Sequence, residues 1–432
     1  MYSATWPTTL AALALCSIHV ARAESVDPSS VPVVNLGYAK YQGVFDRSTN
    51  VTSYLGMSFA APPLGDLRWR EPQAPRQTNG VQQADTEPPS CLQVPAFGNS
   101  PVNPLCNGTN VSSTPVTISD GVAVESEDCL FLDVFFPGPE VPRKKLPVVV
   151  HIHGGGYILG NVSVQSGLDL VVDADHGVVS VLMQYRLGFF GFLAGKEVKR
   201  NGALNAGLLD QEFALKWVQK HIDKFGGDPS KVTIYGESAG AGSVIQHIVA
   251  HGGRTNPPLF RAAITGSTFL PSQYKYDDTV PEALYKAFVS QSGCSSAVDT
   301  LACLRTTDIS ILQDANHNIT LTGYFGTFTS SPVIDGTFIT RSPVEILQRG
   351  VFNGRQLLSS VTSHEGDFFV DQNQTLTVKE YALNLFPQFS DRDGSDVERT
   401  YSGLGNSVEQ INLIYGECRW HITLWVDVSY RR

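Results

Sequence analysis

The sequence has little charge and, above all, no surplus of basic residues. Only 17% of its 432 residues are charged, and 41 acidic residues outnumber 31 basic ones, so the formal net charge is −10. A nucleic-acid-binding surface requires clustered Lys and Arg to neutralise phosphates, and an anionic membrane surface attracts the same residues. We therefore expect neither nucleic acid nor an anionic membrane surface as a partner.

Long hydrophobic runs are missing as well. No stretch after residue 23 approaches the roughly 20 apolar residues of a transmembrane helix. The shorter run Leu10–Val20 precedes Ala21, Arg22 and Ala23, which form a cleavage site of the A-x-A type. This pattern predicts a secretory signal peptide over residues 1–23, with a short buried helix as the alternative, and hence a secreted protein. Cleavage removes Arg22 and changes the net charge from −10 to −11.

Cysteine is scarce, yet its pattern fits the same compartment. Cys16 leaves with the signal peptide, and an even number remains, as expected of disulfides in a secreted protein. The six are Cys91, Cys106, Cys129, Cys294, Cys303 and Cys418. Six N-x-[ST] sequons are candidate glycosylation sites on exposed loops, and they stand at Asn50, Asn107, Asn110, Asn161, Asn318 and Asn373.

No internal repeat and no Pro-, Gly- or Ser-rich linker divides the chain. The nearest feature is the segment 88–119, which is crowded with Pro, Asn, Ser and Thr and lies largely between Cys91 and Cys129. We interpret it as a surface excursion, either a lid or a glycosylated loop. The 42% hydrophobic content suits one large core, and we predict a single domain over residues 24–417.

Strand and helix patterns alternate in the middle of the chain. LPVVVHI (Leu146–Ile152) and VVSVLMQY (Val178–Tyr185) read as buried parallel strands. Apolar residues at helical spacing follow over Asp210–Phe225, GGDP at 226–229 ends that helix, and Val232–Tyr235 reads as another strand. The alternation predicts an α/β fold with a central, mostly parallel, twisted sheet flanked by helices.

The motif GESAGA, residues 236–241, follows the strand at Val232–Tyr235 and precedes the apolar stretch Ala239–Ala250. Strand, sharp turn and helix around G-x-S-x-G form the setting of an exposed nucleophilic serine. Flanking glycines permit the strained turn, and the helix N-terminus favours developing negative charge. Ser238 is therefore the candidate nucleophile, with a chance glycine-rich turn as the alternative.

A second glycine cluster, HGGGY at 153–157, follows the strand Leu146–Ile152. Consecutive glycines let backbone N–H groups approach an oxyanion, and this pattern nominates Gly155, Gly156 and Ala239 as donors. A phosphate cradle lacks support because neither G-x-G-x-x-G nor a Walker lysine is present, and a merely flexible turn is the remaining alternative. His151 and His153 form a possible metal pair without a third ligand, so we predict no metal.

Several longer stretches carry a family resemblance. They are GMSFAAPPLGDLRW (Gly56–Trp69), EDCLFLDVFFP (Glu127–Pro137), YRLGFFGFL (Tyr185–Leu193), DQEFALKWV (Asp210–Val218), FGGDP (Phe225–Pro229), VTIYGESAGA (Val232–Ala241) and PVIDG (Pro332–Gly336). These stretches, together with HGGGY, occur in the order in which they stand in the type-B carboxylesterase and lipase family. The sequence resembles that family over roughly residues 30–416. These are α/β-hydrolases that include cholinesterases and secreted fungal lipases.

The resemblance implies roles for individual residues. Ser238 matches the nucleophile, and Gly155, Gly156 and Ala239 match the oxyanion donors. The family's two disulfides imply the pairs Cys91–Cys129 and Cys294–Cys303, and they leave Cys106 and Cys418 unassigned. Glu365, in TSHEG after the strand-like 356–361, matches the triad acid that orients the imidazole, with an ordinary loop carboxylate as the alternative. Glu237, next to the nucleophile, should border the site.

The catalytic histidine is the part of the pattern that does not appear. The family order is Ser, acid, His, but His421 is the only histidine after Glu365, the H-G-x-[DE] pattern is absent, and the tail 418–432 does not resemble the family. Three readings remain open: the last strands and helices are missing, His421 is recruited, or the chain is a binding or adhesion pseudoenzyme. A complete triad would hydrolyse a small-molecule or lipid ester without a cofactor.

Overall fold

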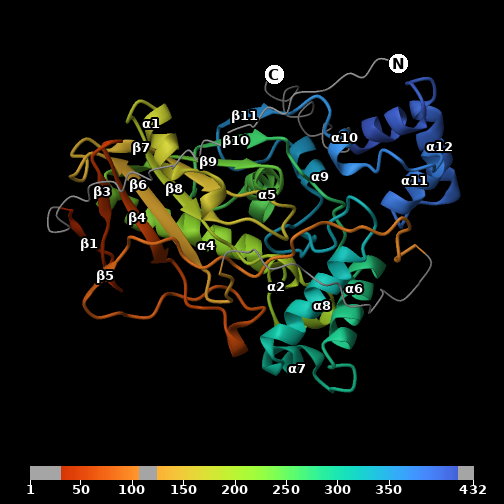
Figure 1. Ribbon diagram of the computed structural model, residues 1–432, viewed down its shortest axis with the longest axis horizontal. Helices are drawn as coiled ribbons and strands as arrows, with labels where there is room; N and C mark the ends of the chain where they lie inside the picture. The colour runs from red at the N-terminus through yellow and green to blue at the C-terminus, as the bar shows by residue number, and fades with distance from the viewer. Residues whose placement is uncertain (1–30, 107–123, 417–432) are drawn as a thin grey trace, which may run out of the picture.

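The structure is a computed structural model that describes residues 31–106 and 124–416. Within these residues a mixed sheet of eight strands forms the centre of the molecule, in the order β11-β10-β9-β7-β8-β6-β4-β3 (Figure 1). The five strands from β8 to β11 in that order run parallel, and β6, β4 and β3 add antiparallel at one edge. The strands are β3 (Val44–Asp46), β4 (Val51–Ser58), β6 (Phe131–Pro137), β7 (Leu146–Ile152), β8 (Val179–Met183), β9 (Gly227–Glu237), β10 (Ala262–Gly266) and β11 (Gln356–Ser360).

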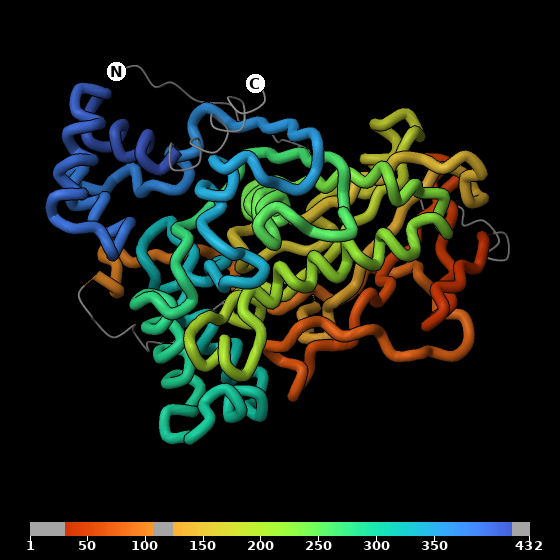
Figure 2. Tube along the Cα trace, turned by 180° about the vertical axis from the view of Figure 1, so that it is seen from behind, coloured from red at the N-terminus to blue at the C-terminus, as the bar shows by residue number. Residues whose placement is uncertain are grey.

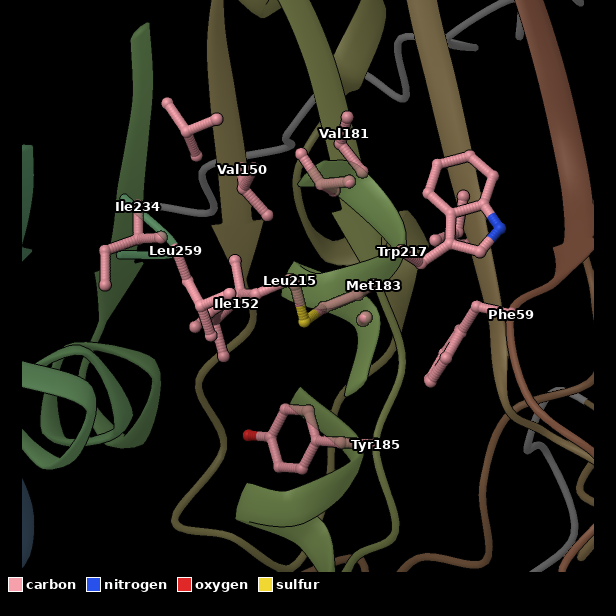
Figure 3. Packing of buried hydrophobic residues seen from close by; sticks show 14 of the residues in the cluster. Phe59, Val150, Ile152, Val181, Met183, Tyr185, Leu215, Trp217, Ile234 and Leu259 are labelled. Atoms are coloured by element: carbon pink, nitrogen blue, oxygen red, sulfur yellow. The ribbon is translucent and has the colours of Figure 1, made fainter. Parts of the chain in front are cut away.

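Helices cover both faces of this sheet. Successive strand residues point to opposite faces, and in β8 Val181 joins one hydrophobic cluster while Leu182 joins another. Helix α1 (Gly167–Asp173) packs on the Leu182 face. Helices α4 (Ala206–His221) and α5 (Ala239–Gly253) pack on the other face, where Figure 3 shows Val150, Val181, Leu215 and Trp217 together. The predicted α/β architecture is therefore confirmed.

The sequence patterns located these elements with small errors at their ends. Strand β7 has the predicted bounds, whereas α4 begins at Ala206 and ends at His221, followed by the 3₁₀ helix η4 (Ile222–Phe225). Gly226, at φ 79°, ends the helix as expected. Strand β9 begins earlier than predicted, because Gly227 already pairs with Leu146 before the register shifts and Val232 pairs with Val148.

Two helical groups extend the sheet on the side away from β3 (Figure 1). The first comprises α2 (Gly188–Phe192), α3 (Lys196–Asn201), α6 (Thr279–Gln291), α7 (Thr300–Thr306) and α8 (Ile309–Leu321). The second comprises α10 (Gly366–Phe369), α11 (Val378–Leu385), α12 (Asp391–Tyr401) and the helical residues 407–416, whereas α9 (Pro343–Gln348) packs with α5 in the main core cluster. Seen from behind, α11 and α12 lie at the opposite end of the molecule from the first strands (Figure 2). A small sheet of β1 (Val33–Asn35), β2 (Lys40–Gln42) and β5 (Val81–Gln83) and the 3₁₀ helices η2 (Gly65–Leu67) and η3 (Val162–Val164) complete the described elements.

Buried polar pairs explain several of the family-like stretches. Arg186 of YRLGFFGFL makes a two-pronged ion pair with Asp210 of DQEFALKWV at 2.7 Å, and both side chains are almost fully buried. Arg68 pairs with Glu127 in the same way at 2.7 Å. Because removing one partner would leave an uncompensated buried charge, these residues fix the packing of segments that are distant in sequence.

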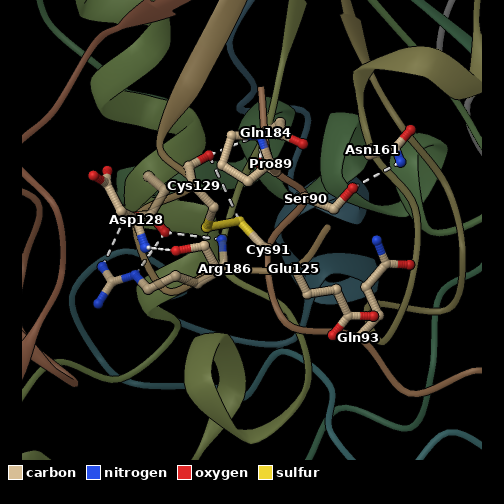
Figure 4. The surroundings of a disulfide bond; sticks show 12 residues. Pro89, Ser90, Cys91, Gln93, Glu125, Asp128, Cys129, Asn161, Gln184 and Arg186 are labelled. Carbon is tan, nitrogen blue, oxygen red and sulfur yellow. Dashed lines mark hydrogen bonds and ion pairs between the residues drawn. A yellow bond between two sulfur atoms is a disulfide. The ribbon is translucent and has the colours of Figure 1, made fainter. Parts of the chain in front are cut away.

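Both implied disulfides are present. Cys91–Cys129 closes the excursion beside β6 and β8, where the Gln184 amide donates to the carbonyls of Pro89 (2.9 Å) and Cys129 (3.0 Å) (Figure 4). The described part of the excursion reaches the helical region, since the Asn103 backbone N–H donates to the Asn384 side chain at 2.9 Å. Cys294–Cys303 joins the end of α6 to α7. Asn107, Asn110, Cys418 and His421 lie outside the described residues.

Over the described ranges, no helix combines the length and apolar character needed to cross a bilayer. Strand β11 is the last strand of the sheet at its parallel end, and Leu358 on it is 65% exposed.

Candidate active site

Ser238 occupies the sharp turn between β9 and α5. Its backbone angles are φ 55° and ψ −122°, a conformation that costs a non-glycine residue on the order of 1–3 kcal/mol. Two hydrogen bonds hold it there: the Ser238 N–H donates to the Gly266 carbonyl (2.9 Å), and the Phe269 N–H donates to the Ser238 carbonyl (3.0 Å). Among the described residues, the Ser238 hydroxyl makes no hydrogen bond. It lies directly after the end of β9 without a described partner.

The two glycines of G-x-S-x-G are required by close packing. A Cβ on Gly236 would overlap the backbone of Gly240, and a Cβ on Gly240 would overlap the carbonyl of Ile152 at the end of β7. The first turn of α5 therefore lies directly on two strand ends. The spacing of small residues in the motif follows from this contact and gives the turn its sharpness.

The glycine loop after β7 lies beside the serine. A Cβ on Gly154 would stand 3.2 Å from the Ser238 Cβ and 2.6 Å from the Glu237 carbonyl oxygen. Gly155 (φ 98°) and Gly156 (φ 61°) adopt the left-handed region, which turns successive N–H groups in a way that other residues resist. Neither N–H donates to another described residue.

Ala239 supplies the third candidate donor. It is the first residue of α5, so its N–H has no acceptor within the helix. The helix N-terminus also carries partial positive charge. The donors expected from the sequence thus come from two adjacent turns, after β7 and after β9, which are neighbouring strands of the sheet.

His151 and His153 are core residues in this arrangement. The His153 ring stacks on Tyr185 at 4.3 Å between centroids, and the Tyr185 hydroxyl donates to the His153 carbonyl at 2.8 Å. The His151 ring lies against Tyr235. Burial lowers the pKa of His151 to about 3 and that of His153 to about 4, so both are neutral at physiological pH. In the described ranges no group of three or more His, Cys, Asp or Glu side chains forms a metal site.

Glu365 follows β11, two strands away from β9. Gly266 of β10 pairs with Glu237 on one side and with Ser360 on the other, so the ends of the three strands lie level. Glu365 precedes α10, five residues after β11, and is 7% exposed. Its carboxylate accepts hydrogen bonds from the Thr362 N–H (3.3 Å) and hydroxyl (3.1 Å). The acid candidate therefore stands at the same edge of the sheet as Ser238.

Among the described residues, no histidine lies in a position that matches the imidazole expected of a triad. No described histidine is hydrogen-bonded to Ser238. His364 is exposed beside Glu365. The other described histidines contact other groups: His176 bonds to the Thr49 carbonyl, His221 packs on Trp217, His247 bonds to Gln211, His251 pairs with Glu212, and His317 bonds to the Gln93 carbonyl.

Two phenylalanines near the site had no signal in the sequence. Phe269 follows β10 and is tied to Ser238 through its backbone, and the Phe328 ring lies against Gly156. Their rings are 5.0 Å apart between centroids. Both line a cavity of about 160 Å³ that is surrounded mainly by apolar side chains. The sequence analysis missed both residues because only tertiary contacts, and no local motif, place them near the site.

Comparison with known proteins decides the family. The family model described as "Carboxylesterase family" matches residues 30–400. This chain belongs to the carboxylesterase family. Carboxylesterase patB of Penicillium expansum is 31% identical over 387 residues, covering 82% of this chain and 68% of the relative. Secreted lipase 1 of Botryotinia fuckeliana is 32% identical over 372 residues, covering 84% of this chain and 64% of the relative.

The crystal structure of Aspergillus niger EstA has the same fold. Its TM-score is 0.76 at 32% identity, and the match covers 90% of this chain and 73% of that chain. The α/β-hydrolase fold expected from the resemblance is thus confirmed. This carboxylesterase-family chain spans about two thirds of the length of the curated relatives that it matches.

Proposed function

We propose that the protein is a secreted serine hydrolase that cleaves carboxylic esters through an acyl-enzyme. One observation carries the proposal: the backbone of Gly154 lies against Ser238, whose strained turn exposes a hydroxyl beside N–H groups without acceptors. Such donors stabilise an oxyanion when they are fixed in advance of the reaction. A metal or organic cofactor is not needed for this chemistry.

In the proposed reaction, the Ser238 oxygen bonds to the ester carbon while its proton passes to a base. The carbonyl oxygen becomes an oxyanion, held by the N–H groups of Gly155, Gly156 and Ala239. The carbon–oxygen bond to the alcohol then breaks, and the alcohol leaves with the proton. Water attacks the acyl-enzyme by the same route and releases the acid.

Glu365 would accept a hydrogen bond from the imidazole that serves as the base, fixing its tautomer. Its burial and its position at the shared sheet edge support this role. His421 is the only histidine that follows Glu365 in the sequence given. Glu237 borders the same turn, where its carboxylate favours cationic character in a bound molecule.

Secretion is proposed from the residues 1–23 pattern and agrees with the name of the relative Secreted lipase 1. Of the six sequons, Asn50 and Asn373 are exposed and are the proposed glycan sites. Asn161 is a poorer candidate, because its side-chain N–H already donates to the Ser90 hydroxyl at 2.9 Å, as Figure 4 shows. We place the catalytic domain at residues 24–417, ahead of the tail 418–432.

A test that needs only an activated serine is covalent labelling. We expect a fluorophosphonate probe to modify the purified chain once, at Ser238 as located by peptide mass spectrometry, and Ser238→Ala to abolish labelling. Glu365→Gln should slow labelling by about 100-fold or more, since the loss of the triad acid in other hydrolases costs up to about 10⁴-fold. Gln keeps the size of the side chain and one acceptor oxygen.

Hydrolysis of 4-nitrophenyl butyrate by the same samples provides the turnover measurement. If the folded chain shows neither labelling nor turnover above that of Ser238→Ala, the proposed activity is wrong. A binding role on the same fold would then be the better account. Labelling at a serine other than Ser238 would contradict the assignment of the nucleophile.

A further inference from the structure

The turn that contains the oxyanion glycines places a tyrosine where glycine is expected. The Gly155 carbonyl accepts from the Ile158 N–H at 3.0 Å and closes a four-residue turn. Its two central residues, Gly156 (φ 61°) and Tyr157 (φ 65°), both have positive φ. Turns of this kind favour Gly, Asn or Asp at both central positions, because a left-handed backbone costs other residues free energy. The surroundings of Tyr157 must therefore hold it in this conformation.

The Tyr157 side chain provides that hold. It is fully buried, and its ring lies 5.0 Å from that of Phe192 and 6.0 Å from that of Phe269 between centroids. Its hydroxyl lies against α5, where a Cβ on Gly242 would stand 2.5 Å away. The Tyr157 carbonyl accepts from the Gly188 N–H at 2.8 Å. The ring thus packs on the nucleophile helix and on the segment after β10.

The same turn fixes the direction of a candidate oxyanion donor. A peptide unit is planar and trans, so its C=O and N–H point in opposite directions. The Gly155 carbonyl accepts from both Ile158 and Leu159, each at 3.0 Å. The Gly156 N–H belongs to the same peptide unit and therefore points away from these two groups. If Tyr157 left the left-handed region, the turn would open and this peptide unit would rotate.

We propose that Tyr157 is a positioning residue for the oxyanion loop: burial of its ring offsets the backbone strain of the turn and keeps the Gly156 N–H aimed at the ester oxygen. The inference rests on the proposed function. The hydroxyl makes no hydrogen bond of ordinary geometry to a described residue, and Ser243 beside it only partly offsets the rise in the Tyr157 pKa that burial causes. Because burial of an aromatic ring is among the largest contributions of a single side chain, the ring holds the turn.

The test compares Tyr157→Ala with Tyr157→Gly, which both remove the ring but differ in the cost of positive φ. We expect Tyr157→Ala to lower kcat for 4-nitrophenyl butyrate and the rate of fluorophosphonate labelling by about 100-fold, the effect of losing one oxyanion donor. KM should stay within about twofold, since the donor acts in the transition state. Tyr157→Gly should regain about tenfold of both rates. Tyr157→Phe keeps the ring and should stay within about threefold of the unchanged protein.

Trp69 offers a matched control, because it also has positive φ (52°), is 1% exposed and lies in a separate hydrophobic cluster. Trp69→Ala should lower the melting temperature and leave kcat and labelling within about threefold. An equal loss of rate in Trp69→Ala overturns the proposal, as does a rate in Tyr157→Ala within about threefold of the unchanged protein. A rate in Tyr157→Gly no higher than in Tyr157→Ala overturns it too. If Tyr157→Ala does not fold, Tyr157→Leu decides by the same limit, with an expected loss of about tenfold.

If the unchanged protein neither labels at Ser238 nor hydrolyses the ester, the proposed function fails, and hydrogen exchange tests the turn by itself. The Ile158 and Leu159 N–H groups donate to the Gly155 carbonyl, so their exchange reports opening of the turn. We expect this exchange to be at least about tenfold faster in Tyr157→Ala. Equal exchange in Tyr157→Ala and the unchanged protein overturns the inference independently of catalysis.

Discussion

At the scale of single residues, this site is built from positions where a side chain would not fit. Gly154 differs from its neighbours Gly155 and Gly156 because it has no positive φ, so only the contact with the Ser238 turn forbids a Cβ. The sequence pattern HGGG nominated the donors, but it could not distinguish a glycine needed for its backbone angles from one needed for space. That distinction depends on a strand end 83 residues further along the chain.

Gly154→Ala tests this contact. The added methyl would lie 2.6 Å from the Glu237 carbonyl oxygen, so the loop must move away from Ser238 and carry its N–H groups with it. We expect labelling by the fluorophosphonate probe to slow by about 100-fold, the effect of losing one oxyanion donor, with little loss of stability. Gly416→Ala, where a Cβ meets nothing within 4 Å, should change neither; an unchanged rate in Gly154→Ala would contradict the assignment.

At the scale of elements, α5 shows how a helix that starts at the Ser238 turn is anchored at its other end. The helix loses helical geometry at Ala250 (φ −51°, ψ 139°), and His251 (φ 54°) follows in the left-handed region. The His251 ring bonds to the Glu212 carboxylate on α4 at 2.7 Å, and Lys216 bonds to the same carboxylate at 2.8 Å. This cluster ties α5 to α4 beyond the helix proper.

His251 makes that anchor depend on pH. The hydrogen bond to Glu212 raises the pKa of His251. Burial acts to raise the pKa of Glu212, but hydrogen bonds from His251 and Lys216 outweigh burial and lower that pKa to about 2. The histidine contribution is complete below about pH 6.5 and is lost as pH rises through the raised pKa; that of Glu212 is complete above about pH 4.5 and is lost on acidification. The pair therefore contributes most between about pH 4.5 and 6.5.

His251→Asn should lower the melting temperature by roughly 1–3 °C at pH 5.5, with a smaller difference at pH 9. Asparagine is suited to the positive φ, so the change removes the ion pair and leaves the backbone preference. His176→Asn is the control, because His176 also has positive φ (58°) but bonds to a backbone carbonyl. A difference that is the same at both pH values would show that the ion pair contributes nothing.

The bounds of the elements show what a local pattern can and cannot predict. The apolar, β-branched run of β7 gives both ends correctly because the strand is buried between two partners. The start of α4 was missed because Asn205 stands in the left-handed region (φ 54°), and nothing local marks Ala206 as helical. The sequence around GGDP reads as a turn, whereas Gly227 pairs with Leu146 on a neighbouring strand. Phe328 reaches Gly156 across 172 residues, beyond any local pattern.

At the scale of the whole molecule, two disulfides restrain very different lengths of chain. Cys91–Cys129 spans 38 residues, whereas Cys294–Cys303 spans 9 residues and joins the end of α6 to α7. The chain-entropy relation assigns about 4 kcal/mol to the first and about 3 kcal/mol to the second. The longer one also holds the excursion that forms part of the cavity wall.

We expect Cys91→Ser with Cys129→Ser to lower the free energy of unfolding by about 1 kcal/mol more than Cys294→Ser with Cys303→Ser. Urea unfolding followed by tryptophan fluorescence measures the difference. Equal losses, or a larger loss for the short loop, would show that strain or residual structure in the unfolded chain outweighs loop length.

The parallel pairing of β10 with β11 joins residues 94 positions apart, from Ala262 to Gln356, and it gives the site an order of arrival during biosynthesis. Ser238 and the glycine loop leave the ribosome first, on strands that pair with each other. Glu365 follows roughly 127 residues later, which is about 6–25 s at ordinary rates of translation. A nascent chain thus carries Ser238 well before the carboxylate that we propose as the triad acid, and the proposed site is complete only after β11 has joined the sheet.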